Sequence, residues 1–208
     1  MQSWHQANAG RITIWISNGY HGNHVIINIT MATASLEEDK NVTSGRDILN
    51  LLSKCKKCLA ITNNGNYITS YMHLPTLVLP KTPTKLAIIV NSERDYSQNV
   101  GHWFVLSIFF SSRSLIVCDG LHQLGDMESE VVQAIIAFAN INGLTYKDLN
   151  VKCQVETSKT CGFICLFFVA KTSLLPQNGL TLLHQVLTRN AIHTNEEYAI
   201  KFVKQHYV

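Results

Sequence analysis

The sequence lacks a hydrophobic run long enough to span a bilayer, and its first residues have neither the basic region nor the apolar core of a secretory signal. Its 6 cysteines among 208 residues are too sparse for a small domain held together by disulfides, so we expect free thiols. A net charge of +3 is far from the strong positive excess of a dedicated nucleic-acid binder, although a modest basic face could still attract DNA. These absences predict an intracellular or virion-enclosed chain with no membrane partner.

The sequence does contain enough apolar material for one sizeable core, since 46% of its residues are hydrophobic. Two β-like pieces at residues 11–17 and 24–30 flank a glycine-containing loop and predict a β-hairpin. We therefore divide the chain into an N-terminal extension, residues 1–40, and a main domain, residues 41–208. The role of the extension stays open between an added interaction surface and a natural start of translation at Met31.

A polar-to-apolar change marks the stretch from Gln154 to Ala170, which reads QVETSKTCGFICLFFVA. The apolar part is long enough for a buried helix, so Cys161 falls where a loop becomes a helix. The amide groups and dipole of a helix N-terminus stabilise a thiolate, and Gly162 leaves the backbone open to a substrate. Taken alone, Cys161 would more simply be a small buried hydrophobe.

A predicted hairpin supplies the partners of a nucleophile. His102 precedes an apolar strand, residues 104–110, and Asp119 follows a second apolar strand, residues 115–118. Pairing of the two strands would place His102 beside Asp119. The carboxylate could then orient the imidazole while its other nitrogen takes a proton from Cys161.

Two further residues complete this arrangement. Gln154, seven residues before Cys161, could donate its side-chain amide to an oxyanion, with the backbone amide of Cys161 as the second donor. His122 is an alternative base, but its position beyond the end of the strand favours His102.

The combined pattern resembles the clan of cysteine peptidases that holds the adenovirus endopeptidase, adenain, and the SUMO- and ubiquitin-like-protein proteases. The matching features are GHW at 101–103, the acid Asp119 seventeen residues after His102, Gln154, and CGFICLFF at 161–168. Thr160, the spacing from Gln154 to Cys161, and the lead-in at 86–103 are similar to the adenain branch. The resemblance covers roughly residues 85–170.

This resemblance implies a cysteine endopeptidase domain that cleaves protein substrates after small residues, of the Gly-Gly or Gly-Ala type. Its implied catalytic residues are His102, Asp119, Cys161 and Gln154, and its implied substrate-binding residues are Trp103 and Gly162. Maturation of viral or virus-like precursors, in a virion or host nucleus, would be the role. The alternatives are an isopeptidase acting on ubiquitin-like modifiers and, from another class, an inactive scaffold or binding module.

The resemblance also implies partners beyond the substrate. Adenain-like enzymes can be stimulated by a short peptide, through a disulfide, and by DNA, but Cys153 does not match the expected position of the disulfide cysteine. We expect a monomer with no cofactor.

A CxxC pair, Cys55 and Cys58, is the one motif that suggests a metal. No second pair follows, and His73 is the nearest third ligand, so structural cysteines are favoured over zinc.

The order of the predicted elements defines the fold class. After the hairpin come a helix at 128–140, a strand at 149–154 that ends at Gln154, and the helix that begins at Cys161. A capping-box pattern at 194–197 predicts the start of the last helix. We therefore expect an α+β fold, with a mixed central β-sheet packed against the cysteine helix and surrounded by further helices.

Overall fold

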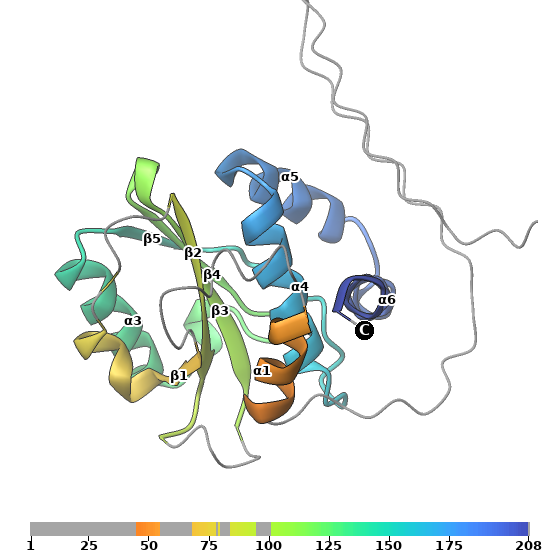
Figure 1. Ribbon diagram of the computed structural model, residues 1–208, viewed down its shortest axis with the longest axis horizontal. Helices are drawn as coiled ribbons and strands as arrows, with labels where there is room; N and C mark the ends of the chain where they lie inside the picture. Colours follow the sequence, from red (N-terminus) through yellow and green to blue (C-terminus); the bar gives the residue numbers. More distant parts are fainter. Residues whose placement is uncertain (1–44, 55–67, 78, 80–83, 95–100, 208) are drawn as a thin grey trace, which may run out of the picture. The chain divides into compact units, whose positions relative to one another are not determined.

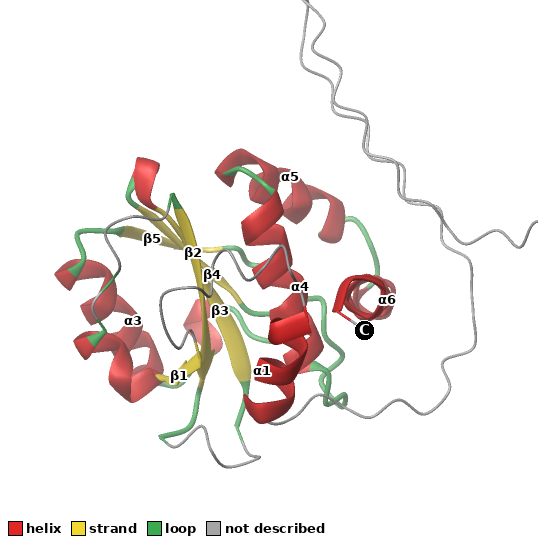
Figure 2. Ribbon diagram, in the orientation of Figure 1, coloured by secondary structure: helices red, strands yellow, loops and turns green. Residues whose placement is uncertain are grey.

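The computed structural model describes residues 45–54, 68–77, 79, 84–94 and 101–207. These residues form an α+β fold around a mixed sheet, as predicted (Figures 1 and 2). The sheet has five strands in the order β1-β2-β3-β4-β5. The hairpin expected in residues 1–40 and the Cys55–Cys58 pair lie outside the described residues, and the division into extension and main domain stays a prediction.

The described residues form five α-helices, five strands and three short 3₁₀ helices. In chain order they are α1 (Gly45–Lys54), β1 (Ile68–Ser70), η1 (Tyr71–Thr76), β2 (Lys85–Asn91), β3 (Trp103–Phe109), η2 (Phe110–Ser112), β4 (Ser114–Cys118), η3 (Leu124–Asp126), α3 (Ser129–Ile141), β5 (Thr145–Asp148), α4 (Cys161–Leu174), α5 (Gln177–Leu187) and α6 (Ile192–Tyr207).

The three central strands are antiparallel neighbours, and the two outer strands pair in parallel. In the register of β3 and β4, Val105 lies opposite Cys118, so the start of one strand meets the end of the other. β1 runs parallel to β2, and β5 runs parallel to β4. Strands β2, β3 and β4 read as nearly continuous apolar runs because both faces of this sheet are covered.

Alternate side chains of the sheet enter two separate cores. Trp103 and Val105 belong to the core shared with α1, α4, α5 and α6, whereas Phe104 and Leu106 belong to the core shared with η1 and α3. Figure 1 shows α3 on one side of the sheet and α4 on the other. The sheet is therefore the middle layer, and α4 is held against it.

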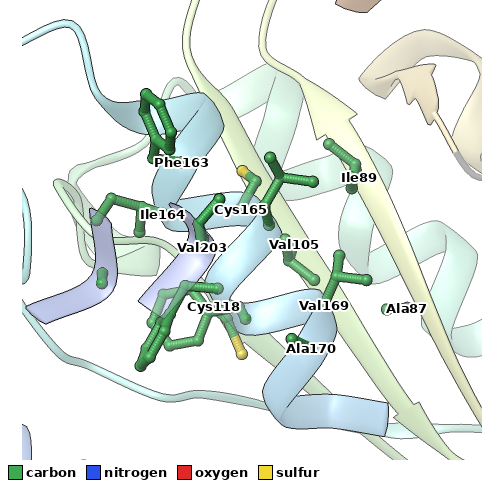
Figure 3. Close-up of a cluster of buried hydrophobic side chains, with 14 of the residues drawn as sticks. Ala87, Ile89, Val105, Cys118, Phe163, Ile164, Cys165, Val169, Ala170 and Val203 are labelled. Atoms are coloured by element: carbon green, nitrogen blue, oxygen red, sulfur yellow. The ribbon is translucent and has the colours of Figure 1, made fainter. Parts of the chain in front are cut away.

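The α4 helix is apolar on nearly every side because the sheet, α1, α5 and α6 surround it. In Figure 3, Cys165 and Val169 lie close to Ile89 and Val105 of the sheet, inside this core. Helix α4 has 14 residues, and none of the described helices is long and apolar enough to cross a membrane. Its hydrophobicity instead fixes it as the central helix of the fold.

Two local predictions were wrong. The strand expected at 149–154 lies earlier, as β5, and its ladder with β4 ends at Asp148. Asn150 then adopts a left-handed conformation with φ of 53°, which an asparagine tolerates, and residues 149–154 form no strand. The last helix begins at Ile192, before the pattern at 194–197, so this pattern does not cap it.

Candidate active site

The β3–β4 hairpin brings His102 next to Asp119, as predicted. Nε2 of His102 lies 2.7 Å from Oδ1 of Asp119. The His102 backbone is fixed by Ser92, whose N–H donates to the His102 carbonyl at 2.8 Å and whose Oγ accepts from the His102 N–H at 2.9 Å. Hydrogen bonds thus hold both the backbone and the ring of His102 in place.

The carboxylate of Asp119 is itself preorganised. It is buried, and its Oδ1 also accepts the backbone N–H groups of Leu121 at 2.7 Å and His122 at 3.1 Å. Two amide donors and the imidazole stabilise a buried anion, which would otherwise be costly. Oδ2 has no hydrogen-bond partner among the described residues. Oδ1 is therefore the oxygen through which the carboxylate acts on His102.

The environment of His102 favours its protonated form. Burial is the largest influence and lowers its pKa, but hydrogen bonds to Asp119 and Cys161, together with the charges of both residues, outweigh burial and raise the pKa to about 9. Because Nε2 is bonded to Asp119, Nδ1 is the nitrogen left for the sulfur of Cys161. The imidazole thus bridges a carboxylate and a thiol.

Cys161 is the first residue of α4, as predicted from the sequence. Its exposed fraction is 9%, and the N-cap residue Thr160 makes no side-chain hydrogen bond to the first-turn amides. These amides and the helix dipole favour negative charge at the position of the sulfur. Gly162 is buried in the same turn, and its role in substrate binding stays a prediction.

Gln154 lies in the segment that leads to Cys161. Its backbone N–H and that of Cys153 both donate to the Gly120 carbonyl, at 2.9 and 2.8 Å. Its side-chain Nε2 donates to the Ser158 carbonyl at 3.2 Å, and its Oε1 is buried without a partner among the described residues. One amide hydrogen and one acceptor are therefore uncommitted, as expected of a group that meets a polar ligand.

Gly120 allows these parts to approach one another, although the sequence alone did not single it out for packing. A Cβ atom at this position would lie 2.6 Å from Cγ2 of Ile164 and 3.1 Å from Sγ of Cys153. The chain after Asp119 therefore packs directly against α4 and the segment of Gln154. The close approach was invisible in the sequence because it joins positions more than 30 residues apart.

The remaining candidates lie around this centre. Trp103 is a fully buried core residue at 1% exposure, and its place at a substrate channel stays a prediction. The ring of His122 stacks edge-on against His102, with 5.0 Å between centroids. Only its backbone N–H contacts Asp119, which agrees with the preference for His102 as the base.

The other thiols differ from Cys161 in their surroundings. Burial raises the pKa of Cys118 to about 12, and burial likewise raises the pKa of Cys153 and Cys165 well above the ordinary range. Cys165 is buried, as predicted. Among the described residues no group of three histidine, cysteine or acidic side chains could hold a metal ion.

A thiol at a helix N-terminus, an imidazole beside it and a buried carboxylate behind the imidazole together define a site capable of nucleophilic acyl transfer.

No family model and no curated protein matches the chain. Two solved structures of the SUMO protease Ulp1, with the catalytic cysteine oxidised to a sulfinic or a sulfonic acid, align with TM-scores of 0.32. They are 9% and 10% identical and cover 74% of this chain and 74% and 75% of theirs. Similarity this low carries no argument about activity, which must be inferred from the geometry of the site.

Proposed function

We propose that the protein is a cysteine endopeptidase in which Cys161 is the nucleophile, His102 the general base and acid, and Asp119 the residue that orients His102. The observation that carries the proposal is the 2.7 Å contact between His102 and Asp119, with the second imidazole nitrogen left for Cys161. The order of these residues along the chain, His102 then Asp119 then Cys161, adds support because it resembles the order in adenain-like peptidases.

The reaction starts from the form of the site in which Nδ1 of His102 already holds the proton of Cys161, as the His102 pKa of about 9 favours at neutral pH. The sulfur then attacks the peptide carbonyl, and a tetrahedral intermediate with a negatively charged oxygen forms. The Cys161 N–H and the uncommitted Nε2 hydrogen of Gln154 are the donors proposed to stabilise this oxyanion. Collapse of the intermediate breaks the C–N bond, His102 returns its proton to the leaving amine, and a thioester remains.

Hydrolysis of the thioester uses the same residues. His102 takes a proton from a water molecule, the resulting hydroxide attacks the thioester carbonyl, and the Cys161 sulfur leaves. A His102 pKa of about 9 keeps the imidazole protonated at neutral pH in the resting site, which is the form that donates to the leaving amine. Asp119 stabilises that positive charge in both halves of the reaction.

The substrate class rests on the resemblance to adenain-like proteases. We propose polypeptide substrates with small residues, of the Gly-Gly or Gly-Ala type, before the cleaved bond. Maturation of viral or virus-like precursors in a virion or host nucleus is the corresponding role. The same triad would also serve an isopeptidase for ubiquitin-like modifiers, so the substrate has to be decided by experiment.

The test is mass spectrometry after treatment with a peptide that ends in Gly-Gly and carries a thiol-reactive electrophile. We expect a single adduct on Cys161, and at least about 100-fold slower labelling in His102→Ala. The buried thiols Cys118, Cys153 and Cys165 are internal controls within the same molecule. Cys161→Ala should remain unlabelled.

Equal, slow labelling of several cysteines, unchanged in His102→Ala, would refute an activated thiol and favour an inactive scaffold. If Cys161 is activated, parallel assays on short precursor peptides and on folded ubiquitin-like fusions will separate the two substrate classes. Cleavage of only the folded fusions would replace precursor maturation by the isopeptidase function.

A further inference from the structure

The carboxylate of Glu196 lies on α6 and contacts the segment that precedes Cys161. Its Oε1 accepts hydrogen bonds from the hydroxyl groups of Ser158 and Thr160, and from the backbone N–H of Val155 at 3.4 Å. The two hydroxyl groups also lie 2.9 Å from each other. One carboxylate oxygen, contributed by a helix about 40 residues further along the chain, thus holds three points of one short segment.

This segment contains the parts of the proposed oxyanion site. It begins at Gln154 and ends at Cys161, and the carbonyl of Ser158 accepts the bond from the Gln154 carboxamide at 3.2 Å. Glu196 is therefore one residue removed from the amide that would contact the substrate: it binds the Ser158 hydroxyl, and Ser158 binds Gln154.

The residue before Glu196 contacts the chain two residues ahead of Gln154. Asn195 is buried, and its Nδ2 donates to the Lys152 carbonyl at 3.3 Å and to the Leu187 carbonyl at 2.8 Å. Lys152 precedes Gln154 and Val155 follows it, so two consecutive residues of α6 hold the backbone on both sides of the glutamine. This arrangement is more specific than general packing of a helix against a loop.

Capping of α6 does not explain Glu196. The helix begins at Ile192, and the N–H of Asn195 already donates to the Ala191 carbonyl at 3.1 Å. Glu196 lies beyond the first turn, where a capping-box acid would not be placed. Its described hydrogen bonds all go to the segment ahead of Cys161.

We propose that Glu196 is a positioning residue, which holds the segment from Val155 to Thr160 so that the Gln154 amide and the Cys161 N–H converge on the oxyanion. The proposal rests on the proposed peptidase function and assigns to α6 a part in catalysis without substrate contact. A charged acceptor shared by three donors restrains the segment more strongly than neutral hydrogen bonds would. Preorganised donors are effective only while their support keeps them in place.

The test compares Glu196→Ala, Glu196→Gln and Glu197→Ala in the full chain. Glu197 is the matched control because it is an exposed glutamate on the same turn of α6. Hydrolysis of a Gly-Gly peptide amide, which forms an oxyanion, is measured beside alkylation of Cys161 by iodoacetamide, which forms none.

We expect Glu196→Ala to lower kcat for hydrolysis about 10- to 100-fold with little change in KM, since the support of one oxyanion donor is lost. Alkylation of Cys161 should stay within about threefold of the wild type because His102 and Asp119 are untouched. Glu196→Gln keeps an acceptor oxygen and should recover part of kcat. Glu197→Ala should behave as the wild type.

Hydrogen–deuterium exchange gives a readout that does not depend on activity. Residues 155–160 should exchange faster in Glu196→Ala than in Glu197→Ala, while β3 and β4 stay protected. Equal kcat or equal exchange in these two variants would overturn the positioning role. An equal fall in alkylation and hydrolysis would also overturn it, because the damage would then not be confined to the oxyanion site.

Failure of the proposed function has a different signature. In that case the wild type itself neither hydrolyses the peptide nor labels selectively at Cys161. If Glu196→Ala does not fold, Glu196→Gln and the double variant Ser158→Ala/Thr160→Val provide the same comparison of kcat, alkylation and exchange.

Discussion

At the scale of single residues, the contact between His102 and Asp119 determines the charge state of the proposed site. The Asp119 carboxylate is the main partner that keeps the buried imidazole protonated up to a pH of about 9. An imidazole of the same burial without this acid would prefer to be neutral. The role of Asp119 can therefore be tested through the titration of His102.

Replacement of Asp119 by asparagine should remove this effect with little change in shape. We expect the pKa of His102 to fall well below 9, since burial then acts without the opposing carboxylate. Hydrolysis of a Gly-Gly peptide amide at pH 7.5 should fall at least about 100-fold because the imidazole is no longer oriented or stabilised as a cation. NMR titration of the His102 ring and the pH profile of kcat/KM measure both effects. An unchanged His102 titration would contradict the assignment.

The same histidine links stability to pH. Between pH 6.5 and about 9 the folded chain keeps a proton on His102 that the unfolded chain has released, so this stabilisation is complete below pH 6.5 and is lost as pH rises through 9. Its upper limit is about 3 kcal/mol. Urea unfolding at pH 6 and pH 9 should show a larger loss in the wild type than in Asp119→Asn. An equal loss of stability in the wild type and in Asp119→Asn would rule out this link between His102 and stability.

Gly120 provides a prediction about packing. Its replacement by alanine places a methyl group against Ile164 and Cys153, at 2.6 and 3.1 Å before any relaxation. We expect a loss of about 1 to 3 kcal/mol in the free energy of unfolding, and a loss of activity, because α4 and the Gln154 segment must move apart. Urea denaturation and the hydrolysis assay check both. Gly125→Ala is the control, since a Cβ atom there would meet nothing within 4 Å.

At the scale of elements, the hairpin and the cysteine helix were predictable because the signals are local. The contact between His102 and Asp119 follows from two adjacent apolar strands joined by a short turn. The position of β5 was not predictable, since residues 149–154 (LNVKCQ) are more apolar than residues 145–148 (TYKD) and only the parallel ladder with β4 selects 145–148. Glu196 was also missed, because its role depends on contacts 36 to 41 residues away.

The interface of α4 with α6 contains a buried lysine whose cost can be measured. Lys171 is 7% exposed, its Nζ lies 3.9 Å from the centroid of the Phe202 ring and 3.3 Å from the Tyr198 hydroxyl, and no described carboxylate pairs with it. Burial lowers its pKa to about 8. The cation–π contact offsets part of the cost of burying the charge.

Replacement of Lys171 by methionine should therefore stabilise the fold at pH 7.5 by about 1 to 2 kcal/mol. A folded pKa below the unfolded value means that the penalty is complete below pH 8 and disappears as pH rises towards 10.5. The advantage of Lys171→Met, measured by chemical denaturation, should shrink between pH 8 and pH 10. A less stable variant at pH 7.5 would indicate that the aromatic contacts outweigh the penalty.

At the scale of the whole molecule, the proposed site draws on one end of the sheet, on α4 and on a helix from the end of the described chain. His102 and Asp119 come from the sheet, Cys161 from α4, and the support of Gln154 from α6. The hydrogen bonds described above for these residues all lie between Ser92 and Glu196. The two cores likewise run from Ile48 to Tyr207.

A chain that begins at residue 41 should therefore keep the fold and the activity. We expect its kcat/KM for a Gly-Gly peptide and its rate of Cys161 alkylation to stay within about threefold of the full chain, because the contacts that set the charge of His102 and the place of Gln154 are retained. Its thermal midpoint should change by no more than about 2 °C, since both cores remain. A large rise in KM with unchanged alkylation would instead assign residues 1–40 to substrate binding. A fall in both alkylation and thermal midpoint would mean that the extension is part of the main domain, and the division at residue 40 would be wrong.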